Sequence, residues 1–335
     1  MIIVGGGYSA CEDTDSASPS CSARKGGSVF VIDADTGALV REFAPASAGS
    51  FAADLSLSDS NHDGSVDFAY GVTTTGEIYR VDFSDAGMQP AASGTWAVRK
   101  VAAISGGRKF LYPPALLRSG GKMYVAVGSG DREHPVSSQY PYASSIRNRF
   151  YMYVDDLAVP ASSTAAVAVA MDTDPAVRNF SSATSCSTEF VTPGSSLKGW
   201  FMDLPGRGEQ TITSALIAGG MVTFNTNRAT PGGTNSCTNP LGESRGYWVN
   251  LLNASGAIGV AGATCGGDRS SVFVGGGLTP SPTLATVVVD GTTETVAIGA
   301  AQRSGGASSG IAPQQVKPAI TSARKTIFWK SNTVD

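Results

Sequence analysis

Short apolar runs separated by tight-turn residues recur along most of the chain and limit what it can fold into. The segment Gly26–Phe43 holds one run, the turn ADTG at Ala34–Gly37, and a second run. The same pattern returns at Val66–Phe83, with Gly76 near the turn. Runs of about four to eight residues bounded by Gly, Asp and Asn are typical of β-strands joined by hairpins. Further copies lie at Lys122–Asp131, Asn148–Asp156, Ala215–Asn227 and Arg245–Gly259.

The spacing of these runs favours one particular all-β architecture. A repeating unit of roughly 40–50 residues with several strands indicates propeller blades. The phrase at Phe30–Val40 (FVIDADTGALV) and a degenerate copy at Tyr247–Val260 resemble the last two strands of a quinoprotein-type blade. We predict a single modified, quinoprotein-like β-propeller of about seven four-stranded blades with negligible helix, one domain over residues 1–335. A large sandwich or two small β domains are the alternatives, but no Pro-rich or charge-rich linker divides the chain.

Composition excludes several classes of partner. Hydrophobic residues make up 41% of the chain, enough for a sizeable core, and the formal net charge is -3. Lys and Arg are scattered without a basic run, which argues against nucleic acid and anionic membranes as partners. No apolar stretch is long enough to span a membrane. The opening MIIVGGGYSA lacks the features of a signal peptide and is typical of a strand, so we expect a C-terminal fragment of a larger secreted protein whose upstream part is missing.

Five cysteines suit a disulfide-containing protein better than a zinc site. No CxxC pair occurs, and the only histidines are His62 and His134. Cys11 and Cys21 bracket a polar loop between two strand-like runs, and we predict a disulfide between them worth about 2–3 kcal/mol. The other three, Cys186, Cys237 and Cys265, lie in Ser-, Gly- and Asn-rich loops and allow one pair plus a free thiol. Cysteines in such loops indicate an oxidising, extracellular setting.

Signals for catalysis are weak. A GxSxG pattern occurs at Gly306–Gly310, but it lies in loop-like sequence and no histidine follows it, so a hydrolase nucleophile is not predicted. His62 and His134 both lie in turn-like sequence, where a solvated histidine is the usual reading. No glycine-rich phosphate loop stands between a strand and a helix. We therefore expect a protein that is not an enzyme.

The stretch DSNHDGSVD predicts a calcium site. Side-chain oxygens fall at loop positions 1, 3, 5 and 9, and Gly64 stands at position 6, as at the start of an EF-hand loop. The expected ligands are the side chains of Asp59, Asn61, Asp63 and Asp67, with the backbone carbonyl of Ser65. Clustered carboxylates repel one another unless a cation lies between them. The simpler alternative is a solvated hairpin turn, because Asp, Asn, Ser and Gly are also the usual turn formers.

A second unusual phrase, VGSGDREHP, follows a strand-like run. Asp131, Arg132, Glu133 and His134 are adjacent in it. The expectation is a loop held by local ion pairs, each worth little at a surface.

Several phrases, taken in order, resemble one known family. The calcium loop followed by YGVTTTGEIYRVDF, the segment VGSGDREHP with NRFYMYVDD after it, and GWFMDLPGRGEQTITSALIAGGMVTFNTN are similar to segments of the C-terminal β-propeller domain of the PilY1/PilC type IV pilus proteins. The opening GGGYSA and the terminal TIFWK also fit. The similarity extends from about residue 3 to about residue 265.

The resemblance implies a modified propeller with Ca²⁺ on one blade and a role in pilus biogenesis, extension and retraction control, and adhesion. It implies a location at the pilus tip or outer cell surface, with minor pilins and a host or abiotic surface as partners. It matches the calcium ligands to Asp59, Asn61, Asp63, Ser65 and Asp67. Two departures matter: GVTTTG replaces an acidic phrase of the family, and no RGD occurs, only Arg207-Gly208-Glu209.

Two other functions remain as alternatives. An extracellular carbohydrate-binding propeller would have the same strand pattern. A quinoprotein (PQQ-type) dehydrogenase would share the propeller but commonly carries adjacent cysteines, which are absent from this chain. A glycan array and a quinone absorbance spectrum would separate these from the pilus function.

Overall fold

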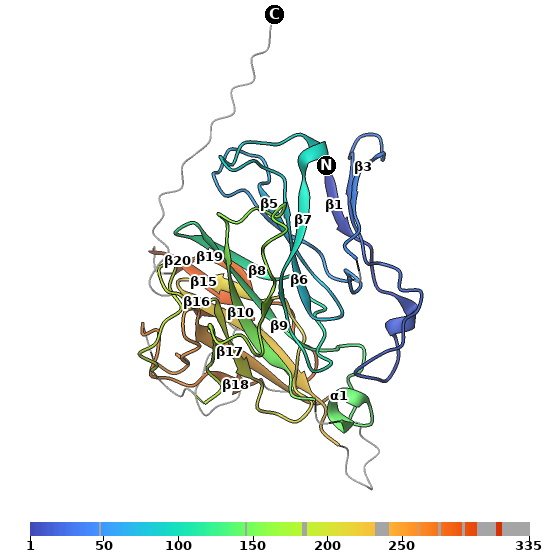
Figure 1. Cartoon of the computed structure of the whole chain (residues 1–335). Coiled ribbons are helices and arrows are strands. Elements are labelled where there is room, and N and C mark those ends of the chain that lie inside the picture. The colour runs from blue at the N-terminus through green and yellow to red at the C-terminus, as the bar shows by residue number, and fades with distance from the viewer. Residues whose placement is uncertain are drawn as a thin grey trace, which may run out of the picture.

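The strands form a row of sheets that follow one another in chain order, as Figure 1 shows from the blue N-terminal sheet to the orange C-terminal one. The structure is a computed structural model. It describes residues 1–46, 48–144, 146–182, 186–231, 241–260, 262–273, 276–289, 292–299 and 313–316.

Five sheets are present in these ranges, and we number them by chain order. Sheet 1 has the order β1-β2-β3, with strands β1 (Ile2–Gly5), β2 (Val29–Ile32) and β3 (Leu39–Phe43). Sheet 2 has the order β11-β7-β6-β5-β4, with strands β4 (Ser56–Ser58), β5 (Phe68–Val72), β6 (Glu77–Asp82), β7 (Ala97–Ala103) and β11 (Val169–Ala170). Sheet 3 has the order β12-β13-β10-β9-β8, with strands β8 (Ala115–Ser119), β9 (Lys122–Gly128), β10 (Arg149–Asp156), β12 (Val177–Asn179) and β13 (Gly199–Asp203).

The remaining elements complete the row. Sheet 4 contains β14 (Gln210–Thr211), β15 (Leu216–Ala218), β16 (Met221–Arg228), β17 (Glu243–Asn250) and β18 (Ser270–Val272). Sheet 5 contains β19 (Thr283–Val289), β20 (Thr292–Ile298) and β21 (Pro313–Gln315). The helices within the described ranges are single turns: η1 (Ala10–Glu12), η2 (Ser93–Thr95) and α1 (Tyr140–Ala143). None of them is long and apolar enough to span a membrane.

Successive sheets pack face to face because the central strands are apolar on both sides. In β10, Tyr151 and Tyr153 pack toward sheet 2, whereas Phe150, Met152 and Val154 pack toward sheet 4. Neighbouring residues of a strand point to opposite faces, so an unbroken apolar run is what a strand buried on both sides requires. The sequence FYMYV therefore encodes a position between two other sheets.

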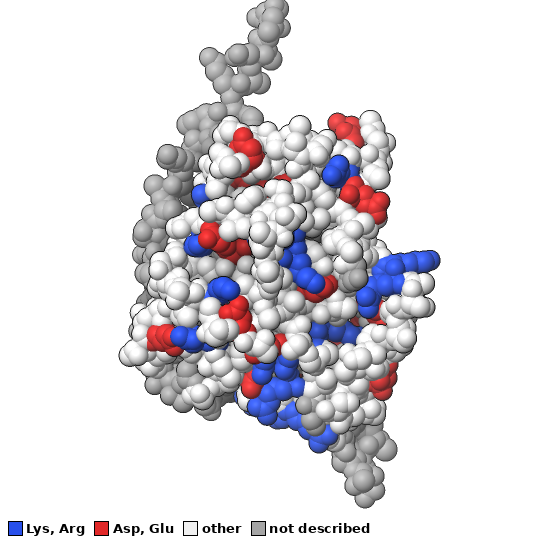
Figure 2. Space-filling view, viewed as in Figure 1, with Lys and Arg blue, Asp and Glu red and all other residues white. Residues whose placement is uncertain are grey.

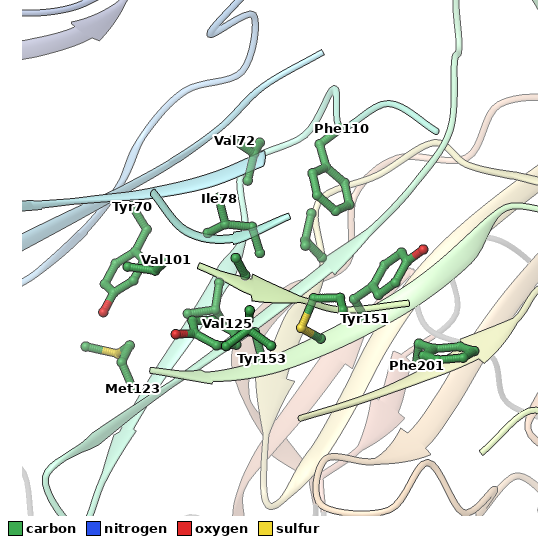
Figure 3. Packing of buried hydrophobic residues seen from close by; sticks show 14 of the residues in the cluster. Tyr70, Val72, Ile78, Val101, Phe110, Met123, Val125, Tyr151, Tyr153 and Phe201 are labelled. Carbon is green, nitrogen blue, oxygen red and sulfur yellow. The ribbon is translucent and has the colours of Figure 1, made fainter. Parts of the chain in front are cut away.

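Each pair of neighbouring sheets shares one hydrophobic cluster. Figure 3 shows the cluster between sheets 2 and 3, which contains Tyr70 and Ile78 from sheet 2 and Val125 and Tyr151 from sheet 3. Corresponding clusters join sheet 1 to sheet 2, sheet 3 to sheet 4, and sheet 4 to sheet 5. Among the described residues, no such cluster joins sheet 5 back to sheet 1.

The all-β, propeller-like fold that the sequence predicts is confirmed, but the strand count per sheet differs. The described sheets have three or five strands, instead of four in each of about seven blades. The difference arises partly from β11 and β12, which join their sheets in parallel to β7 and β13 and add a fifth strand to each. The strand–turn–strand pattern itself is correct: Val29–Ile32 and Leu39–Phe43 pair around the ADTG turn, where the Asp33 carboxylate accepts the backbone N–H of Thr36 at 2.8 Å.

A buried ion-pair network ties sheet 2 to sheet 3. Arg80 on β6 is fully buried, and its guanidinium donates to Asp155 on β10 at 2.7 Å and to Asp82 at 2.6 Å. The hydroxyls of Tyr70 and Tyr153 also donate to Asp155, at 2.8 and 3.1 Å. Burial, followed by the negative charge of Asp155, raises the pKa of Tyr70 well above its ordinary value, so the phenol stays a donor.

Two disulfides fix the loops around this framework. Cys11 and Cys21 are bonded to each other, as the sequence predicts. A second bond joins Cys186 to Cys265 across 79 residues, a pairing that the sequence left open. In the loop-entropy account, closing a loop of that length stabilises the fold by about 4–5 kcal/mol. Cys237 lies outside the described residues.

Replacing Asp155 by Ala should destabilise the protein by about 3–5 kcal/mol, because the buried charge of Arg80 and two buried hydroxyls lose their acceptor. The neighbouring Asp156→Ala is the matched control. Asp156 is 45% exposed and pairs with Lys122 at the surface, so its loss should cost less than about 1 kcal/mol. Urea unfolding of both variants measures the difference, and equal losses would contradict a special role for Asp155.

Candidate functional site

The predicted calcium loop forms the hairpin connection between β4 and β5 in sheet 2. Ser58 pairs with Phe68, so residues 59–67 leave and re-enter the sheet at adjacent positions. Two residues of the loop have positive φ: Gly64 at 92°, and His62 at 62°, which is uncommon for a residue with a side chain. These conformations let the backbone curl tightly.

The loop curls around the first of its acids. The Asp59 carboxylate accepts backbone N–H groups from His62 at 2.7 Å, Asp63 at 3.2 Å and Gly64 at 2.9 Å. Asp63 in turn accepts the N–H of Ser65 at 2.8 Å and the side-chain amide of Asn61 at 2.9 Å. The bond from Ser65, then that from Asn61, lowers the pKa of the exposed Asp63 carboxyl below its ordinary value.

Two neighbouring segments brace the loop. The Asn61 side chain also donates to the backbone oxygen of Met88 at 2.7 Å, which attaches the loop to the turn that follows β6. The guanidinium of Arg118 on β8 donates to the backbone oxygen of Ser60. The loop is thus held from sheets 2 and 3 together.

Asp67 is placed differently from the other predicted ligands. It is 1% exposed, and its carboxylate accepts the backbone N–H of Ser60 at 2.7 Å, at the base of the loop. Nowhere among the described residues do three or more His, Cys, Asp or Glu side chains form a group that could hold a metal ion. The structure therefore brings Asp59, Asn61 and Asp63 onto one turn but does not gather the three carboxylates.

The loop nevertheless fits a hard cation in its chemistry. Its side-chain donors are carboxylate and amide oxygens, which are the ligands that Ca²⁺ takes, and Ca²⁺ tolerates irregular geometry. The backbone N–H groups that Asp59 accepts already hold the turn in a curled shape. Calcium binding here remains a prediction.

The second phrase, VGSGDREHP, lies at a buried polar cluster and not at a surface loop held by weak ion pairs. Asp131 is 2% exposed, and one of its carboxylate oxygens contacts Lys109 Nζ at 2.6 Å, Tyr140 Oη at 2.6 Å and His134 Nδ1 at 3.0 Å. The side chain of Gln210 joins the same cluster by accepting the backbone N–H of Asp131 and donating to the backbone oxygen of His134. Burial raises the pKa of Asp131, but the bonds from Lys109 and Tyr140 outweigh it and hold that pKa below the ordinary value.

The disulfide-closed loop 11–21 covers this cluster. Glu12, 1% exposed, accepts the hydroxyl of Thr74 at 2.8 Å and pairs with Arg24 at 2.5 Å, while its backbone oxygen accepts Lys109 Nζ at 3.5 Å. Asp15 accepts the backbone N–H of Tyr140 at 2.5 Å. The Cys11–Cys21 bond therefore closes a loop that contacts sheet 2 and the Asp131 cluster at once.

The partners of Asp131 could not be found from the local sequence. Lys109 and Gln210 stand far from it in the chain, and nothing in their own surroundings marks them as partners. The buried state of His134 was also missed, whereas His62 is exposed as expected. The GxSxG pattern at 306–310 lies outside the described residues.

Asp131→Asn should destabilise the protein at pH 7 by about 3 kcal/mol, because Lys109 would be left buried without its counter-charge. The pKa of Asp131 in the folded state lies below its pKa near 4 in the unfolded state. The stability that the ionised carboxylate contributes is therefore complete above the unfolded-state pKa, and it is lost as the pH falls through the lower folded-state pKa. The difference in the free energy of unfolding between wild type and variant should therefore shrink below about pH 4. Urea midpoints at pH 7 and pH 3 test this, with the exposed Asp35→Asn as control; a gap that stays constant would refute it.

Comparisons with known proteins place the fold. The chain matches no protein-family model and none of the curated proteins. Among solved structures it is similar to the C-terminal domain of PilY1 from Pseudomonas aeruginosa, with a TM-score of 0.58 and 17% identity over 88% of this chain and 67% of that one. The quinohemoprotein alcohol dehydrogenase ADHIIG from Pseudomonas putida HK5 also matches, at 13% identity over 81% of this chain and 36% of that one, but its TM-score of 0.38 is too low to support any argument. The chain shares its fold with the PilY1 C-terminal domain.

Proposed function

We propose that this chain is a calcium-binding, propeller-like domain of a type IV pilus protein, acting at the pilus tip or outer cell surface. In this role it contributes to pilus biogenesis, to the control of extension and retraction, and to adhesion. The observation that carries the proposal is the fold shared with the PilY1 C-terminal domain over 88% of the chain. The order of the phrases that resemble this family in the sequence supports the same assignment.

The calcium part of the proposal rests on the loop between β4 and β5. Asp59, Asn61 and Asp63, with the carbonyl of Ser65, would hold the ion. The carboxylate of Asp67 would join them by giving up its bond to the backbone N–H of Ser60. Bound Ca²⁺ would neutralise carboxylates that otherwise repel one another, and it would stabilise the folded state by mass action. The loop is attached both to the turn at Met88 and to Arg118 on sheet 3, so ordering it would stiffen the contact between two sheets.

The compartment and the absence of catalysis belong to the same proposal. Two disulfides within one chain fit an oxidising, extracellular environment. The buried carboxylates of Asp131 and Asp155 are each paired with a buried basic side chain, Lys109 and Arg80, which suits structural roles. We therefore assign a binding function and no enzymatic one.

Calorimetry with Ca²⁺ and Mg²⁺ tests the metal site. Wild type should bind one Ca²⁺ more tightly than Mg²⁺, because the loop supplies irregularly placed oxygens. Asp59→Ala and Asp63→Ala should each lose most of the affinity, since each removes a charged ligand. His62→Ala is the matched control and should bind like wild type. No calcium heat at millimolar concentrations, or full affinity in Asp63→Ala, would make the loop an ordinary turn.

A pull-down against the minor pilins of the same organism tests the pilus assignment. The immobilised domain should retain at least one minor pilin in calcium-containing buffer. The Asp59→Ala variant separates the two parts of the proposal, because loss of calcium without loss of the pilin would leave the assignment intact. Failure to retain any minor pilin, with or without calcium, would contradict the pilus role.

A further inference from the structure

Six arginines gather on one surface at the ends of sheets 3 and 4, although the whole chain has a net charge of -3. In Figure 2 blue side chains collect at the lower edge of the visible face, beside the position of α1 in Figure 1. The members of this arginine patch are Arg108, Arg147, Arg149, Arg207, Arg228 and Arg245.

Hydrogen bonds and ion pairs connect one half of the patch. Arg108 donates to the backbone oxygen of Arg147 at 2.7 Å. Arg108 and Arg149 share Asp172, at 3.5 and 2.6 Å, and Arg149 and Arg147 share Asp203, at 2.7 and 3.6 Å. Each carboxylate on this side thus lies between two guanidinium groups.

The other half is built around α1 and β17. Arg207 donates to the backbone oxygen of Tyr142 at 3.0 Å and stacks on its ring at 4.8 Å. Gly206, the chain neighbour of Arg207, lies against the Arg228 side chain. Arg228 shares Glu243 with Arg245, at 3.0 and 2.7 Å. Arg207 itself bonds to backbone carbonyls instead of a carboxylate.

The patch carries more positive than negative charge. Its six arginines face three shared carboxylates, and a fourth acid, Glu209, is buried beneath it and bonded to Tyr247 at 2.7 Å. Residues 145 and 232–240, which adjoin Arg147 and Arg228 in the chain, contain no charged side chain that could offset the excess. Arg147 is 60% exposed and Arg207 is also exposed, so both can reach a partner.

A cavity borders the patch and extends the surface that a partner could contact. It has a volume of about 620 Å³, and its charged lining residues are Asp203, Asp268 and Arg269. Arg269 donates to the backbone oxygens of Phe180 and Ser181, at 2.7 and 3.1 Å, and Asp268 in the same lining offsets its charge, so the excess positive charge belongs to the patch itself. A bound segment could place a side chain in this cavity while its acids meet the arginines.

We infer that the arginine patch is a docking surface for an acidic segment of a protein partner. Guanidinium groups bind carboxylates in a fixed, two-pronged geometry, which suits separate acidic side chains. Asp172, Asp203 and Glu243 interrupt the patch, so the regularly spaced phosphates of a nucleic acid would meet like charge at intervals. An acidic peptide has separately spaced carboxylates, so it can place them opposite the arginines and keep them away from the acids of the patch. The inference goes beyond the calcium proposal, since it involves none of the loop residues.

Fluorescence anisotropy with a labelled peptide of alternating Glu and Ser tests the inference, in EDTA so that the calcium loop plays no part. Wild type should bind this peptide and not its Lys–Ser counterpart. The affinity should fall as ionic strength rises from about 0.01 to 0.15 M. The double variant Arg147→Glu, Arg207→Glu should bind at least about tenfold more weakly, because it brings like charges together.

Arg41→Glu, on the remote sheet 1, is the matched control and should bind like wild type. If the double charge reversal unfolds, Arg207→Gln alone should still weaken binding about threefold, because Arg207 is exposed and holds no carboxylate. Absence of binding at low salt, or wild-type affinity in the double variant, would overturn the inference. Tighter binding of duplex DNA than of the acidic peptide would also overturn it, in favour of a general polyanion surface.

Discussion

Burial of the central strands on both faces is the constraint on which the rest of this structure depends. A strand such as β10 contributes Tyr151 to one cluster and Met152 to the next, so no face of it is left for solvent. Polar groups inside such a stack must find partners within it, since an unpaired buried charge is costly. Arg80 with Asp155, and Lys109 with Asp131, meet that requirement between sheets. Groups that are free to meet a ligand therefore lie on turns and strand ends.

The sequence is most informative where a signal is local. The unbroken run Phe150–Val154 indicates a strand buried on both sides, and the ADTG turn predicts the β2–β3 hairpin. The spacing of Asp59, Asn61 and Asp63 likewise predicts a tight turn lined with oxygens, because those side chains bond to backbone groups a few residues away. The inward position of Asp67 could not be read from that spacing, since it depends on how the loop meets the sheet.

Features that depend on distant residues were not predictable. The two-residue strand β11 has no periodicity of its own and exists because β7 offers it an edge. Cys186 and Cys265 looked like loop cysteines without an obvious partner. The arginine patch has the same origin: no basic run occurs in the sequence, yet the ends of β10, β16 and β17 bring arginines from different strands together.

The parallel addition of β11 to sheet 2 has a consequence for how the chain folds. Sheets built from successive hairpins can form early, because their contacts are local in sequence. Sheet 2 is different: β11 pairs with β7 only after the chain has passed through β8, β9 and β10 of sheet 3. The closure of that long segment must be complete before sheet 2 has all its strands. Sheets 2 and 3 should consequently reach their final form in one cooperative step, instead of folding one after the other as independent repeats.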